Sequence, residues 1–126
     1  MNVKVLLLIL ASVGLSAIAQ VTLKLGMSSK RVQDTLVTVG GRLDSALTIL
    51  TEPMVLIGLG LYGIGALTWL LVLAKLDVSA AYPFLGLGFV ITMLLGWLLL
   101  GESIGFLRVI GAVLICIGIV LVASTT

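Results

Sequence analysis

Residues 53–101 form the stretch PMVLIGLGLYGIGALTWLLVLAKLDVSAAYPFLGLGFVITMLLGWLLLG, in which only Lys75 and Asp77 carry a charge. The uncharged runs on either side of this pair, 53–74 and 78–101, contain 22 and 24 residues. A helix needs about 20 apolar residues to cross the hydrocarbon core of a bilayer. The stretch therefore predicts two transmembrane helices, and their short connection makes them antiparallel neighbours.

Two further uncharged runs flank this stretch, residues 5–23 with 19 residues and 109–126 with 18. A transmembrane β-barrel would instead show alternating segments of about 10 residues, and the sequence has none. We therefore expect an all-α membrane protein with one domain, residues 1–126. Its four helices should form an antiparallel bundle and span about 3–25, 54–75, 79–100 and 104–124.

The composition agrees with a protein embedded in lipid. The chain is 61% hydrophobic and 10% charged, whereas soluble domains carry about 25% charged residues. A net charge of +2 and this hydrophobicity exclude a soluble globular domain, a disordered chain and a nucleic-acid binder. The chain has no His and a single Cys, so we expect no disulfide framework, metal site, cofactor or enzyme.

The N-terminal run also has features of a secretory signal. Lys4 precedes an apolar stretch that reaches Ala17-Ile18-Ala19, a pattern similar to a cleavage site. Removing this run would leave three helices, an awkward number for a bundle. We therefore expect the first helix to be retained.

One connection is long. Residues 27–53 mix apolar and charged side chains around Gly40-Gly41. We expect one or two short amphipathic pieces here, lying at the membrane interface.

Basic residues lie mostly on one side of the expected bundle. The first and third connections hold Lys24, Lys30, Arg31, Arg42 and Arg108. The opposite side holds only Lys4 and Lys75. Since Lys and Arg favour the cytoplasmic side, this bias places both termini outside the cytoplasm. A bias this small is also typical of an antiparallel dimer of dual topology.

Polar residues follow one face of the first helix, because Ser12, Ser16, Gln20 and Lys24 are each four positions apart. We expect Ser12 to bond a carbonyl one turn back in its own helix. Gln20 either lines a cavity or contacts another helix, and plain packing is the alternative. Lys24 either snorkels to the membrane surface or holds an anionic headgroup.

The second and third helices supply further candidates. Pro83, in the first turns of the third helix, is expected to disturb it. Tyr62 is expected in the core, whereas Trp69 is a candidate wall of a cavity. Trp69, Tyr82 and Pro83 complete the candidate substrate-binding set with Ser16, Gln20 and Lys24.

The fourth helix is expected to be an assembly surface. Gly111 and Gly118 are seven residues apart, with Leu114 and Ile115 between them. Small residues at this repeat allow helices to approach closely. Four helices packed around their own core leave little room for a solute, so a transporter built from this chain would need a second subunit. We expect a dimer through these four residues.

Several stretches resemble a known family. Ile110-Gly111-Ala112-Val113-Leu114-Ile115-Cys116-Ile117-Gly118 is similar to the fourth-helix dimerisation stripe of small multidrug resistance proteins, in the drug/metabolite transporter superfamily. Gly101-Glu102 resembles the pair that ends the preceding helix there. Nearer still are small flippase subunits for undecaprenyl phosphate-linked aminoarabinose. With these the chain shares Trp69-Leu70-Leu71-Val72-Leu73, Ala81-Tyr82-Pro83 and Ser16-x-x-x-Gln20-x-x-x-Lys24.

This resemblance implies a transporter, with one departure. Small multidrug exporters carry a Glu in the first helix that binds protons and cationic drugs, and Ser16 occupies the matching position here. The resemblance then implies a lipid-linked sugar as substrate, with its phosphate near Lys24 and its sugar bonded by Ser16 and Gln20. It also implies a multi-pass protein of a bacterial-type inner membrane, as a homodimer or with a related small subunit.

Two other functions stay open at this stage. One is the export of small cationic solutes, as in small multidrug resistance proteins. The other is a non-transporting membrane subunit of a glycosyltransferase complex.

Overall fold

The computed structural model describes residues 2–37 and 42–125, and every regular element within them is helical. Four helical spans are long and apolar enough to cross a membrane: Val3–Met27, Pro53–Leu73, Val78–Leu100 and Phe106–Ala123. The expected boundaries lie within two residues of these ends. The prediction of an all-α protein with four transmembrane helices is therefore confirmed.

Local chemistry explains where the helices begin and end. Helix α1 (Val3–Met27) begins after Asn2, whose Oδ1 accepts a hydrogen bond from Lys4 N at 3.1 Å. Helix α4 (Pro53–Leu73) begins on a proline, which needs no hydrogen-bond partner for its nitrogen in the first turn. Helix α6 (Leu85–Leu100) ends at Gly101, where φ is 68°, a left-handed conformation that favours glycine.

The third span is interrupted near its start. It consists of α5 (Val78–Ala81), the 3₁₀ turn η1 (Tyr82–Phe84) and α6. Pro83 lies in the middle of the turn, because its ring prevents the regular hydrogen bond to the preceding turn. The disturbance expected at Pro83 thus takes the form of a 3₁₀ turn.

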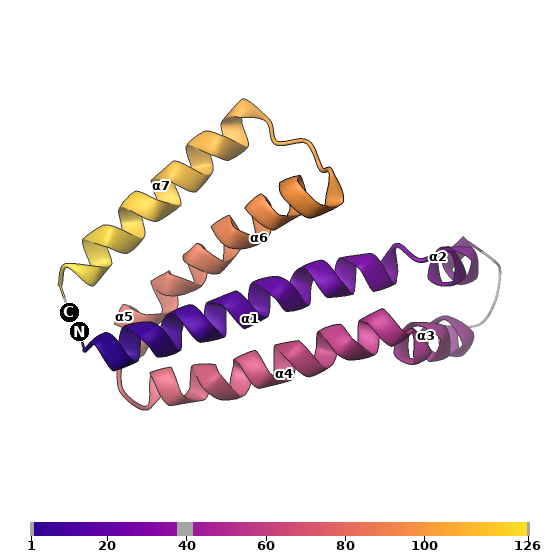
Figure 1. Cartoon of the computed structure of the whole chain (residues 1–126), viewed down its shortest axis with the longest axis horizontal. Coiled ribbons are helices and arrows are strands. Elements are labelled where there is room, and N and C mark those ends of the chain that lie inside the picture. Colours follow the sequence, from indigo (N-terminus) through magenta and orange to yellow (C-terminus); the bar gives the residue numbers. More distant parts are fainter. Residues whose placement is uncertain (1, 38–41, 126) are drawn as a thin grey trace.

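Helices α1 and α4 form the tightest pair. They run antiparallel beside each other in Figure 1. A Cβ atom added to Gly26 would lie 2.8 Å from the backbone nitrogen of Val55, and one added to Gly58 would lie 2.8 Å from Leu23 Cδ2. Glycines on both helices therefore permit a close contact, as in other membrane helix pairs.

The buried core joins α1 and α4 to the interrupted third span. It contains six buried residues, with further apolar side chains packed against them; the six are Val5, Ile9, Val13, Val72, Ala81 and Phe84. Helix α6 lies beside α1, on the side away from α4 (Figure 1). The order across the molecule is therefore α4, α1, α6 and α7.

Helix α7 (Phe106–Ala123) is peripheral. None of its residues is buried, and it packs on α6 and η1 (Figure 1). Lipid solvates its apolar surface as well as another helix does, so no hydrophobic force closes the four helices into a ring. Helix α7 therefore contributes only partly buried side chains, Ile119 and Ala123, to the shared core.

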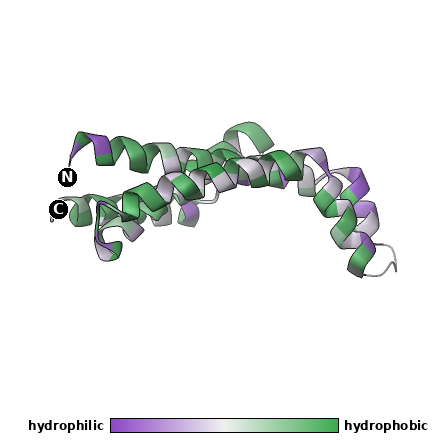
Figure 2. Ribbon diagram, turned by 90° about the horizontal axis from the view of Figure 1, so that it is seen from below, coloured by the Kyte–Doolittle hydropathy of each residue, from purple (hydrophilic) through white to green (hydrophobic). Residues whose placement is uncertain are grey.

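The long connection folds as two short helices, α2 (Lys30–Val37) and α3 (Arg42–Thr51). Figure 2 shows both turned sharply aside from the long helices and richer in hydrophilic residues. This agrees with the expected short amphipathic pieces, and the orientation is that of helices lying along a membrane surface.

Polar contacts hold this pair of helices at its base. Arg31 Nη2 donates to Thr51 Oγ1 at 2.5 Å and to the Thr48 carbonyl at 3.1 Å. Arg31 also lies 3.9 Å from Glu52 Oε2, which accepts a hydrogen bond from Ser29 Oγ at 3.3 Å. These contacts join α2 to α3 and to Glu52 at the start of α4.

Candidate functional site

A groove of about 750 Å³ opens between α1, α4, the interrupted third span, the α6–α7 connection and the first turn of α7. It combines apolar walls with hydroxyl, amide and charged groups. Its lining residues are Val13, Ser16, Ala17, Gln20, Tyr62, Tyr82, Leu85, Gly88, Phe89, Thr92, Met93, Glu102, Ile104 and Arg108. A polar lining between helices is the usual mark of a substrate pathway in a membrane protein.

Helix α1 contributes Ser16 and Gln20, one turn apart, to this groove. The sequence singled out both residues, and the structure brings them together. Ser12 differs from its expectation. Its Oγ donates to the Gly65 carbonyl of α4 at 2.8 Å, because the close helix contact brings that carbonyl within reach. Ser12 therefore joins two helices instead of bonding its own.

The aromatic residues exchange their expected roles. Tyr62 lines the groove from α4, although it was expected in the core. Trp69 packs against the buried core and does not line this groove. The two residues are seven positions apart, and spacing alone does not tell which part of a helix faces a hollow. Tyr82 lines the groove beside the turn that Pro83 shapes, whereas Pro83 itself does not line it.

The groove is also lined by two charged residues, Glu102 and Arg108. Sequence reasoning did not place either of them in the site. Glu102 Oε1 would lie 2.5 Å from a Cβ atom on Gly96, so the carboxylate rests against this glycine of α6. Its backbone nitrogen donates to the Gly96 carbonyl at 3.2 Å. Arg108 Nη1 donates to the Ser103 carbonyl at 3.3 Å. The Gly101-Glu102 pair was the available signal, since a left-handed glycine turns the chain back over the helix end.

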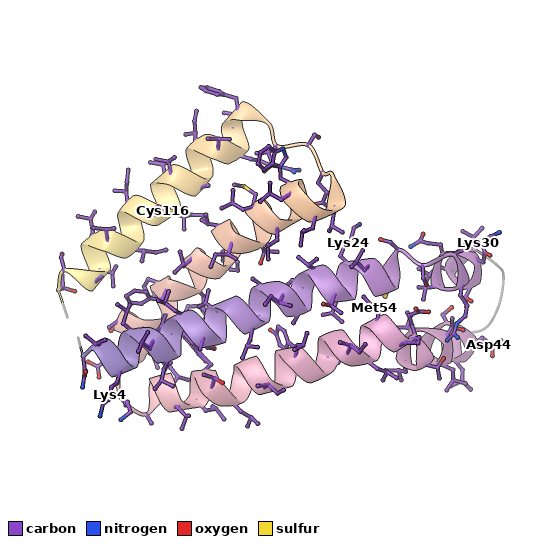
Figure 3. The ribbon with its side chains drawn as sticks, in the orientation of Figure 1. Lys4, Lys24, Lys30, Asp44, Met54 and Cys116 are labelled. Atoms are coloured by element: carbon purple, nitrogen blue, oxygen red, sulfur yellow. The ribbon has the colours of Figure 1, made fainter. Side chains whose placement is uncertain are left out.

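Lys24 lies outside the groove. It is exposed in the last turn of α1, near the entry to α2, and Figure 3 labels it there. Four-residue steps along a helix accumulate a rotation of about 40° each. The polar face has therefore turned away from the groove by the second step after Ser16.

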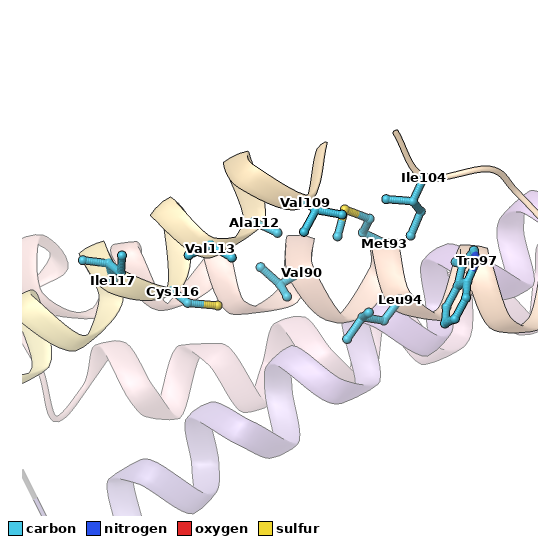
Figure 4. A pocket seen from close by; sticks show the side chains of 10 residues that line it. All are labelled: Val90, Met93, Leu94, Trp97, Ile104, Val109, Ala112, Val113, Cys116 and Ile117. Atoms are coloured by element: carbon cyan, nitrogen blue, oxygen red, sulfur yellow. The ribbon is translucent and has the colours of Figure 1, made fainter. Parts of the chain in front are cut away.

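A second hollow, of about 520 Å³, separates α6 from α7 and has an apolar lining (Figure 4). Val90, Leu94 and Trp97 face it from α6, and Val113 and Cys116 face it from α7. Met93 and Ile104 line both this crevice and the polar groove. The two hollows are therefore adjacent.

The expected assembly residues of α7 do not all face the same way. A Cβ atom on Gly111 or Gly118 would meet nothing within 4 Å, and Leu114 is exposed. Ile115 instead packs inward, because its Cγ2 would lie 2.8 Å from a Cβ atom on Gly86 of α6. An open surface thus carries Gly111, Leu114 and Gly118. In the described part of the chain, no three His, Cys, Asp or Glu side chains gather as metal ligands would.

Comparison with known proteins decides the family. The profile of the EamA-like transporter family matches residues 8–124. The chain belongs to this family. With its four membrane-spanning helices, this EamA-like transporter is a multi-pass protein of a bacterial-type inner membrane. Membership indicates a transporter.

Two relatives match nearly the whole EamA-like chain. One is the probable 4-amino-4-deoxy-L-arabinose-phosphoundecaprenol flippase subunit ArnE of Pseudomonas fluorescens, 34% identical over 94% of this chain and 96% of the relative. The other is the probable flippase subunit ArnF of Shewanella sediminis, named for the same substrate, 31% identical over 97% of this chain and 89% of the relative. No solved structure matches the chain significantly.

Proposed function

We propose that this chain is a subunit of a flippase that moves a polyprenyl phosphate-linked aminosugar across the inner membrane. The observation that carries the proposal is the groove, which brings hydroxyl, amide and charged groups to one side of an otherwise apolar chain. Relatives that cover most of the chain are named as flippase subunits for such a lipid. The presence of this groove within a single chain also argues against the alternative that the chain is a non-transporting subunit of a glycosyltransferase complex.

The groove fits a headgroup in transit. A sugar crossing a bilayer loses hydrogen bonds to water, and each unreplaced bond is costly in hydrocarbon. Ser16, Gln20 and Thr92 offer replacements along the groove. The neighbouring apolar crevice allows the polyprenyl tail to stay in a hydrocarbon environment beside α6.

The remaining candidates take supporting roles in the proposal. Lys24, exposed at the end of α1, attracts the phosphate at headgroup depth before the lipid enters the groove. Pro83 shapes the turn that presents Tyr82. Trp69 supports the wall from the core, without contact to the substrate.

A partner subunit completes the proposal. Relatives of both names, ArnE and ArnF, are called subunits. The open surface of α7, with Gly111, Leu114 and Gly118, offers a contact for a second small subunit of the same or a related chain.

Transport in proteoliposomes tests the function. The reconstituted chain, alone and with a related small subunit, should move the aminoarabinose ester of undecaprenyl phosphate to the opposite leaflet. Gln20→Leu and Thr92→Val should slow this movement, because each removes polar groups from the groove. Thr68→Val is the matched control, since Thr68 bonds the Ile64 carbonyl of its own helix at 2.9 Å and lies outside the groove. Equal rates for Thr92→Val and Thr68→Val, or no movement by the wild type in either preparation, would contradict the proposal.

A further inference from the structure

Glu102 and Arg108 are the only charged residues that line the groove within the described part of the chain. They carry opposite charges, and both are exposed. Glu102 lies in the connection between α6 and α7, and Arg108 lies in the first turn of α7. Charged groups that line a pathway in a membrane protein are costly, and they usually serve the substrate or each other.

Among the residues that the structure describes, 2–37 and 42–125, no counterion lies within 4.0 Å of either charge. The Glu102 side chain has no hydrogen bond there, and Arg108 has one of 3.3 Å to the Ser103 carbonyl. The two side chains thus line the same groove without forming an ion pair with each other.

The position of the carboxylate depends on its neighbours. Gly101 reverses the chain at the end of α6, and Gly96 leaves room for Glu102 Oε1 against the helix. A side chain at position 96 would occupy the place of the carboxylate, since its Cβ would lie 2.5 Å from Oε1. The carboxylate therefore lies back along the groove instead of extending away from the end of the helix.

We propose that Glu102 binds the ammonium group and Arg108 the phosphate group of one lipid headgroup. This inference rests on the proposed function, because an aminosugar phosphate carries both charges, separated by one sugar ring. Each ionic hydrogen bond replaces water that the headgroup loses on entry. Glu102 then distinguishes an aminosugar from a neutral sugar, and Arg108 holds any polyprenyl phosphate.

Binding to the full-length chain, measured by native mass spectrometry in mild detergent, tests this assignment. The probes are undecaprenyl phosphate, its 4-amino-4-deoxy-L-arabinose ester and the N-acetylated form of that ester, which has no ammonium. The wild type should bind the amine form about ten- to a hundred-fold more tightly than the N-acetylated form, as expected for one charge-assisted contact. Glu102→Gln should abolish this preference and leave the affinity for undecaprenyl phosphate unchanged.

Arg108→Gln should weaken the binding of all three probes by a common factor of about ten to a hundred. Asp77→Asn and Lys75→Gln are matched controls, because both residues are exposed on the α4–α5 connection and neither lines the groove. Glu102→Asp keeps the charge on a shorter side chain and should retain part of the preference. Far-ultraviolet circular dichroism establishes that each variant keeps its helices.

The outcomes separate the two proposals. A wild type that binds none of the three probes contradicts the proposed function. A wild type that prefers the amine form, with the preference intact in Glu102→Gln, contradicts only the role of Glu102. Phosphatidylethanolamine also carries an ammonium and a phosphate, so it serves as competitor. Displacement of the aminosugar lipid by an equal concentration of phosphatidylethanolamine would overturn the assignment to a sugar headgroup.

Discussion

Gln20 and Lys24 are one helical turn apart on α1, yet only Gln20 lines the groove. The difference lies in the environment of each side chain. A charge–charge contact at a water-exposed site contributes up to about 1 kcal/mol, because water and salt screen it. Arg108 is exposed as well, but it lines the groove, whereas Lys24 does not. For a phosphate bound in the groove, Arg108 is therefore expected to matter more than Lys24.

Replacing Lys24 tests this difference at the scale of a single residue. Lys24→Gln should lower the affinity for undecaprenyl phosphate by less than about fivefold, which corresponds to about 1 kcal/mol. Lys24→Arg should bind as the wild type does, because the charge is kept. Titrating undecaprenyl phosphate into both Lys24 variants and into Arg108→Gln ranks the three losses of affinity. A loss for Lys24→Gln as large as that for Arg108→Gln would assign the phosphate to α1.

Among the helices, the α1–α4 pair depends on glycines at its contact. Gly26→Ala should destabilise the chain by about 1–3 kcal/mol, as overpacking does elsewhere. The reason is that the new Cβ would lie 2.8 Å from the backbone nitrogen of Val55, which cannot rotate away. Gly14→Ala is the control on the same helix, because nothing lies within 4 Å of its Cβ position. Thermal unfolding in detergent compares the two variants. Equal midpoint temperatures of unfolding would mean that α1 and α4 pack more loosely than described.

Helix α1 also bears on the alternative of cation export. No ionisable residue lies between Lys4 and Lys24, and Ser16 stands where small multidrug exporters carry an acid. A serine does not exchange a proton for a cation in this pH range. Any binding of tetraphenylphosphonium should therefore lack a steep dependence on pH between about 5 and 8. Isothermal titration across this range measures it, and a steep rise in affinity would favour the drug exporter.

For the whole molecule, the open surface of α7 predicts assembly. A leucine in place of Gly118 would hold a partner helix away from this surface, and typical interhelical terms suggest a loss of about 1–2 kcal/mol in association. Gly105→Leu is a control outside α7 that also meets nothing within 4 Å. Fluorescence energy transfer between labelled chains in liposomes reports the dimer. Unchanged transfer for Gly118→Leu, or none for the wild type, would count against α7 as the contact.

The sequence alone determined the number, type and boundaries of the transmembrane helices. The reason is physical: a lipid-embedded helix must satisfy its backbone internally and keep charges out of the hydrocarbon, so uninterrupted apolar length marks each span. Pro83 and Gly101 likewise act through their own backbone chemistry, and both appear where local rules expect them. The four-residue steps of Ser16 and Gln20 located one wall of the groove for the same local reason.

Only the tertiary structure decided which faces meet. Apart from the face of α1 with Ser16 and Gln20, the long helices are almost entirely apolar, so few polar side chains mark the direction of a neighbour. Ser12 therefore bonds across to α4, Tyr62 and Trp69 exchange places, and Ile115 turns inward. Glu102 enters the site because the chain reverses at Gly101 and rests this side chain against Gly96 of α6, and Arg108 enters it from the first turn of α7. These contacts depend on how the helices pack against one another, and the length of an apolar run does not specify that packing.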